Sequence, residues 1–89
     1  AERWGQLKSM ERAGAIDQLE RQIKYELNVN GQKICSYIAD YTYLLLDEDG
    51  SSRFIVEDAK GVLTPEFRLK KKLMLAIHGI DILLTFKKK

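Results

Sequence analysis

The chain has 89 residues, 45% of them hydrophobic and 31% charged, and its formal net charge at pH 7 is +2. This balance predicts one folded domain over residues 1–89 and excludes a disordered chain. No stretch approaches about 18 consecutive apolar residues, so we expect no membrane-spanning segment, and the lone cysteine, Cys35, is typical of a reducing, cytoplasmic protein.

The first predicted element is a helix, and the chain begins inside it. Trp4, Leu7 and Met10 follow helical spacing, and Gly14 supplies a C-terminal stop. We therefore expect the domain to be truncated at its N-terminus. The charged start also lacks the apolar run of a signal peptide.

Three strands come next. Apolar and polar residues alternate over residues 22–29, which is typical of a half-buried strand. Asn30-Gly31 is the strongest short signal for a hairpin turn, and it leads into a second strand over residues 33–46. A third strand is expected over residues 53–60.

A helix and a strand close the chain. Thr64, Pro65 and Glu66 supply the N-cap, the first-turn proline and the first-turn anion of a helix that ends at Gly79. Residues 80–86 form the last strand. The order helix, three-stranded meander, helix, strand predicts an α/β fold with a mixed central sheet flanked by helices.

The loop between the second and third strands decides where Asp40 points. A two-residue Asp49-Gly50 turn would place Asp40 opposite Ala59. A three-residue loop with Gly50 in the left-handed region places Asp40 directly opposite Asp58 instead, and hydrophobic matching favours this second register.

This register gathers apolar side chains on one face of the sheet. The set is Ile34, Ile38, Leu44, Phe54 and Val56. The preceding hairpin pairs Ile23 with Ile38 and extends the same face onto the first strand. We expect this face to form the core, with the two aspartates at its end.

Two carboxylates that face each other across a strand pair repel, and burying them is costly unless each has a partner. Lys60, two residues beyond Asp58, shares their face and offsets one charge, as in a structural salt bridge. Two carboxylates at strand ends are also what a hard divalent cation takes, beside several waters. A lysine next to such a metal orients a water and stabilises a developing phosphorane charge.

A resemblance to a known superfamily rests on "AD" at residues 39–40 and "EDAK" at residues 57–60. In this order of elements, these stretches resemble the signature of the PD-(D/E)XK nuclease superfamily. Nearly the whole chain is similar to a phage and prophage family of uncharacterised proteins related to Holliday-junction resolvases. The stretches that resemble this family most are "GAIDQLERQIKYEL", "YIADYTY", "VEDAKG" and "RLKKKL".

The resemblance implies a site and a reaction. Asp40 and Asp58 would be metal ligands, the backbone carbonyl of Ala59 a further ligand, and Lys60 the catalytic lysine. The implied cofactor is Mg²⁺, with Mn²⁺ as a substitute. The implied activity is that of an endodeoxyribonuclease in the host bacterial cytoplasm, specifically a phage Holliday-junction resolvase acting on branched DNA.

Three further positions bear on this resemblance. Ala39 replaces the proline of the superfamily name, a common variation. The superfamily's glutamate on the first helix aligns immediately before Ala1, and Glu2 takes its place only if the alignment shifts by two residues. Gln22 is an accessory candidate by the same likeness, although strand parity points it away from Asp40.

Basic residues on the second helix are the predicted DNA contact. They are Arg68, Lys70, Lys71 and Lys72, and residues 87–89 add a second lysine run. Such a cluster either contacts phosphates or forms the solvated side of the helix.

The face away from the aspartates is the predicted homodimer surface. We expect the second helix to cover Tyr37, Tyr41, Tyr43 and Leu45 incompletely, and a resolvase-like enzyme needs a dimer to nick two strands symmetrically. Glu57 points to this face as well, where it is expected to be solvated or to lie beside an outer helix.

Two other functions compete with the nuclease. One is a non-catalytic DNA-binding or phage assembly module with an incomplete site. The other is a domain that binds a small molecule or protein, in which the acidic pair is only structural.

Overall fold

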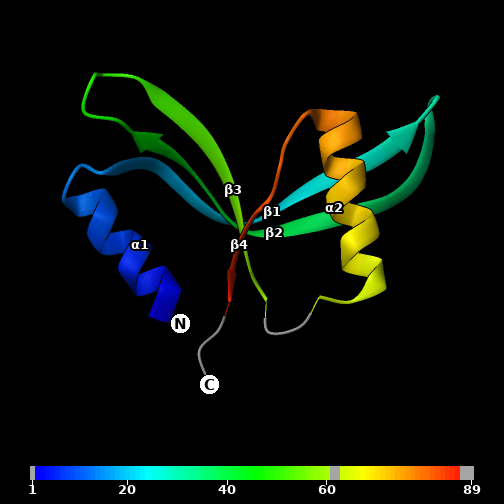
Figure 1. The fold of residues 1–89 in the computed structure, drawn as a ribbon, viewed down its shortest axis with the longest axis horizontal. Helices are drawn as coiled ribbons and strands as arrows, with labels where there is room; N and C mark the ends of the chain where they lie inside the picture. Colours follow the sequence, from blue (N-terminus) through cyan, green and yellow to red (C-terminus); the bar gives the residue numbers. More distant parts are fainter. Residues whose placement is uncertain (1, 61–62, 87–89) are drawn as a thin grey trace.

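The computed structural model describes residues 2–60 and 63–86. Its elements are α1 (Glu2–Arg12), β1 (Ile16–Val29), β2 (Gln32–Leu46), β3 (Ser52–Lys60), α2 (Pro65–His78) and β4 (Leu83–Phe86), as Figure 1 shows. They form one mixed sheet in the order β1-β2-β3-β4, in which β4 runs parallel to β3 and the other neighbours are antiparallel. The predicted α/β class and element order are therefore confirmed. None of the described helices is long and apolar enough to cross a membrane.

β1 begins six positions before the predicted start at residue 22. Gln18 and Gln22 have left-handed φ values of 51° and 56°, and the pairing with β2 shifts between Asp17 and Glu20. Bulges of this kind break the alternation of apolar and polar residues. The first half of β1 therefore lacks the sequence pattern of a strand.

The register between β2 and β3 is the predicted one. Thr42 pairs with Val56 and Leu44 with Phe54. The connection spans residues 47–51, longer than the three-residue loop that was expected, but Gly50 has the predicted left-handed φ, at 88°.

The predicted register between β1 and β2 is wrong by one residue. Ile23 pairs with Ala39 rather than Ile38, because the register shifts between Leu27 and Asn28. A slip of one position moves a side chain to the other face of a sheet.

The predicted core face is also wrong in part. Ile34, Ile38 and Phe54 are 55%, 57% and 54% exposed, whereas Tyr37 and Tyr43, placed on the supposed outer face, are each only 3% exposed. Outside its pairing with β3, β2 pairs only with β1 in the described part of the sheet. On this two-stranded part, α2 covers the side on which Tyr37 lies.

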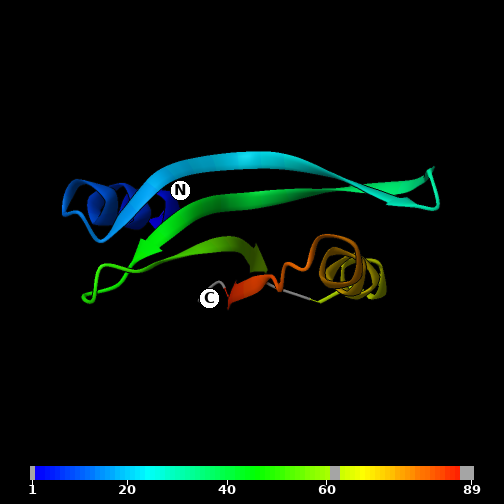
Figure 2. The same cartoon turned by 90° about the horizontal axis from the view of Figure 1, so that it is seen from above.

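Two small cores replace a single large one. The α2 cluster contains Leu27, Tyr37, Ala39, Val56, Phe67, Met74 and Ile82. The α1 cluster contains Leu7, Ile16 and Tyr43, with Ile55 packed against it. Figure 2 shows α1 near one end of the long β1–β2 pair and α2 near the other. Since Ile55 and Val56 belong to different clusters, the end of β3 lies between them.

Candidate functional site

Asp40 and Asp58 come together where β2 leaves β3. The last pair of this ladder is Tyr41 with Glu57, so the two aspartates are the next residue on each strand. The side chain of Asp40 accepts a hydrogen bond from the backbone N–H of Ala59, through Oδ2 at 2.9 Å. The structure thus places the Asp40 carboxylate directly beside the Asp58–Ala59 peptide.

Asp58 is fully buried, and Tyr37 is one of its partners. The Tyr37 hydroxyl donates a hydrogen bond to Oδ2 of Asp58. Burial, and then this hydrogen bond, raise the pKa of Tyr37 far above that of a free tyrosine, so the hydroxyl stays a donor. The expectation that Tyr37 lies away from the aspartates is therefore wrong.

The donor set fits a hard cation, although it is small. Two carboxylates and the carbonyl of Ala59 are oxygen ligands of the type that Mg²⁺ takes, with waters completing the coordination. Among residues 2–60 and 63–86, no three or more histidine, cysteine, aspartate or glutamate side chains gather in a way that would hold a metal. Lys60 ends β3 and pairs with Phe86, but its side chain lies outside the described part of the structure.

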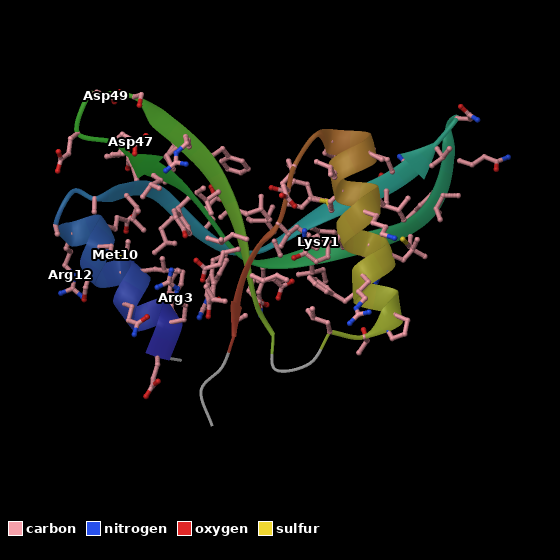
Figure 3. The ribbon with its side chains drawn as sticks, viewed as in Figure 1. Arg3, Met10, Arg12, Asp47, Asp49 and Lys71 are labelled. Carbon is pink, nitrogen blue, oxygen red and sulfur yellow. The ribbon has the colours of Figure 1, made fainter. Side chains whose placement is uncertain are left out.

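Glu57 is buried on the opposite side of β3 and bonded to α1, so of its two expected environments solvent is wrong and the neighbourhood of an outer helix is confirmed. Arg3 donates to its carboxylate through Nε (2.7 Å) and Nη2 (2.8 Å). Tyr43 donates its hydroxyl at 2.7 Å, and Thr85 does so at 3.3 Å. We call Arg3, Tyr43, Glu57 and Thr85 the Glu57 network. Figure 3 shows Arg3 reaching from α1 toward the strands.

The Glu57 network sets the protonation states of Glu57 and Tyr43 as well as the positions of their side chains. Burial alone would raise the pKa of Glu57, but hydrogen bonds from Arg3 and Tyr43 outweigh it and hold the pKa below its ordinary value. Burial and the hydrogen bond to Glu57 raise the pKa of Tyr43 to about 12. The group at neutral pH is therefore a carboxylate, a guanidinium and a neutral phenol. In the sequence, the only signal for this network was a charged residue inside an apolar strand.

The two accessory candidates lie at the edge of this region. Glu2 is exposed in the first turn of α1, next to Arg3. Gln22 is exposed and lies between the pairs Arg21–Tyr41 and Ile23–Ala39. The one-residue shift of register thus brings Gln22 level with Asp40 rather than with Ala39.

Two of the predicted DNA-contacting residues of α2 form ion pairs, and the other two are exposed. Lys70 forms an ion pair with Glu66 at 3.1 Å, and Lys71 forms one with Asp81 at 2.7 Å. Arg68 and Lys72 are exposed. The second lysine run, residues 87–89, lies outside the described residues.

A shallow groove of about 350 Å³ separates β2 from the first turns of α2. Its lining residues are Ser36, Tyr37, Ile38, Thr64, Glu66, Phe67 and Lys70. Because the Tyr37 hydroxyl also bonds Asp58, this residue joins the groove to the acidic pair.

Comparison with known proteins identifies a family but no activity. A family model described as "Protein of unknown function (DUF1064)" matches residues 1–88. No curated protein and no solved structure matches the chain.

Proposed function

Because the chain belongs to the DUF1064 family of proteins of unknown function, we propose a function from its own site, that of a metal-dependent endodeoxyribonuclease. The proposal rests on one observation. Asp40 and Asp58 are the residues next to the last pair of the β2–β3 ladder, and the Asp40 carboxylate accepts a hydrogen bond from the N–H of Ala59 at 2.9 Å. The resemblance of residues 39–40 and 57–60 to the PD-(D/E)XK signature supports the same function.

In this proposal different residues bind the metal, orient its ligands and act as the catalytic lysine. Asp40, Asp58 and the carbonyl of Ala59 would hold Mg²⁺ or Mn²⁺. When bound, the metal supplies a Lewis acid that lowers the pKa of water and neutralises charge on a phosphodiester. The chain's own contribution is orientation, since Tyr37 and the Ala59 N–H each hold one of the two carboxylates. Lys60 is the proposed catalytic lysine.

DNA is the proposed substrate and the cytoplasm the proposed location. The exposed side chains of Arg68 and Lys72 on α2 supply positive charge for phosphates. Branched DNA such as a Holliday junction is the specific substrate that the resemblance favours. A homodimer would let such an enzyme nick two strands symmetrically.

A non-catalytic DNA-binding or phage assembly module is the second candidate. It is favoured by the full burial of Asp58 and by its hydrogen bond from Tyr37. A metal ligand needs access to the ion, and a buried carboxylate gains it only when nearby groups move.

Cleavage assays separate the candidates. Branched, flapped and linear DNAs are incubated with the protein, with and without Mg²⁺ or Mn²⁺, beside an Asp58→Asn control. The nuclease predicts metal-dependent cleavage that the control lacks. DNA binding without cleavage supports the second candidate. Neither binding nor cleavage supports a domain whose acidic pair is only structural.

A further inference from the structure

Glu57 brings three separate elements to the end of β3. Its carboxylate is fully buried and receives hydrogen bonds from α1 through Arg3, from β2 through Tyr43 and from β4 through Thr85. The Thr85 hydroxyl also lies 3.5 Å from the backbone carbonyl oxygen of Asp58. The Glu57 network therefore surrounds the backbone next to the candidate site.

Stability alone does not account for such a network. Replacing a buried ion pair by apolar side chains of similar volume is often neutral or stabilising, because the desolvation penalty disappears with the charges. A buried network with all its partners in place does fix one arrangement of its elements. The Glu57 network is thus better suited to setting a position than to adding free energy.

The position it sets is that of Asp58. Successive side chains of a strand point to opposite faces, so anchoring Glu57 toward α1 turns Asp58 toward Tyr37. The same anchoring holds the backbone N–H of Ala59, which follows Asp58, at the Asp40 carboxylate.

We propose that Glu57 is a positioning residue of the candidate site, acting through Arg3, Tyr43 and Thr85 to hold Asp58 and Ala59 in place. The metal-binding part of this inference rests on the proposed function. The positional part concerns the hydrogen bond between Ala59 and Asp40 and is testable without metal.

The main test removes the ion pair while keeping the volume, with the double variant Arg3→Met/Glu57→Met. Hydrogen exchange measured by NMR should show the Ala59 amide exchanging about tenfold faster, while the amide of Met74, in the α2 cluster, is unchanged. Calorimetry should show Mn²⁺ affinity reduced about tenfold, as when other outer-shell partners are lost.

A purely structural role predicts a different result. Ala59 and Met74 would then exchange faster together, because the whole fold opens more often. Unchanged Ala59 exchange and Mn²⁺ affinity in a folded double variant would overturn the inference. If the double variant does not fold, Arg3→Lys decides, since lysine keeps the charge but loses the bidentate geometry; its Ala59 exchange should rise about threefold, and no change would overturn the inference.

A third variant separates this inference from the proposed function. If Asp58→Asn leaves Mn²⁺ affinity unchanged, the metal site is wrong, and Ala59 exchange still decides the positional role. If Asp58→Asn abolishes Mn²⁺ binding and Arg3→Met/Glu57→Met does not weaken it, the metal site stands and the positioning role fails.

Discussion

At the scale of single residues, two neighbouring carboxylates have opposite environments. Glu57 is bonded to a guanidinium from α1, whereas Asp58 accepts a hydrogen bond from a neutral phenol on β2. Both are fully buried. One strand end therefore combines a carboxylate paired with a guanidinium and a carboxylate that accepts a hydrogen bond from a phenol.

The depressed pKa of Glu57 makes stability depend on pH. A carboxyl group whose pKa is lower in the folded than in the unfolded protein stabilises the fold at pH values above its pKa in the unfolded protein. This stabilisation is lost as the pH falls through its pKa in the folded protein. We expect the free energy of unfolding to decrease between about pH 5 and pH 3. Urea denaturation at a series of pH values measures it. Glu57→Gln should flatten this dependence, whereas Glu48→Gln in the exposed loop should not.

Tyr37→Phe tests the hydrogen bond to Asp58. The variant keeps the ring but removes a donor to a buried carboxylate, which should cost about 1–3 kcal/mol of unfolding free energy. Tyr41→Phe is the matched control, because Tyr41 is half-buried and stacks its ring on Trp4. Equal stabilities of the two variants in urea would contradict the role of the Tyr37 hydroxyl.

At the scale of elements, α2 follows its sequence signals closely. The Thr64 side chain caps the N–H of Phe67 at 3.1 Å, and Gly79 ends the helix with φ of 68°. Ion pairs to Glu66 and Asp81 occupy Lys70 and Lys71. The helix therefore offers DNA fewer available cations than its lysine run indicates.

Paired variants of α2 test which cations contact DNA. Arg68→Ala/Lys72→Ala should lower the slope of log affinity against log salt by about 2, since each phosphate contact contributes about 0.9. Lys70→Ala/Lys71→Ala should change it less, because those lysines already have acidic partners. Both pairs should keep the helix, as alanine is the better helix former. Fluorescence anisotropy with duplex DNA gives the slopes. Equal slopes for the two double variants would contradict the expected difference between the exposed and the ion-paired residues.

At the scale of the whole molecule, the chain is thin and extended. It measures 41 × 34 × 18 Å with a radius of gyration of 14.1 Å, against about 12 Å for a compact domain of this length. Among the residues whose side chains the structure describes, eight large apolar ones are at least 40% exposed, including Ile34 and Ile38 on the outer side of β2. Exposed apolar area of this kind is typical of a binding surface.

We predict a homodimer, but at a different surface from the one read from the sequence. Tyr37 and Tyr43 are buried, so the tyrosine face is unavailable, and Ile34 and Ile38 replace it. Sedimentation should show a mass near twice 10.3 kDa, and Ile34→Thr/Ile38→Thr should shift it to the monomer while keeping strand propensity.

Leu75→Gln is the control for this prediction, since Leu75 is similarly exposed but lies on α2. A single species at 10.3 kDa for the unmodified chain would contradict the homodimer.

The sequence by itself determined the order of elements, the caps of α2 and the register of β2 against β3. These depend on neighbours a few positions apart: Thr64 caps a nearby N–H, Gly79 accepts a left-handed φ, and Gly50 shapes the turn that sets Asp40 beside Asp58. Local rules suffice because backbone sterics and short hydrogen bonds determine them.

Tertiary structure alone decided which face of the sheet is covered and how Glu57 is compensated. One bulge near Leu27 shifts the β1–β2 register, so that Ile23 pairs with Ala39 rather than with Ile38, a change that hydrophobic alternation does not indicate. Arg3 and Glu57 are 54 positions apart, and in the sequence each looks like an ordinary solvated charge. Only the packing of α1 against the sheet buries Glu57 and brings the partly exposed Arg3 to it, which makes Arg3 the necessary partner of a buried carboxylate.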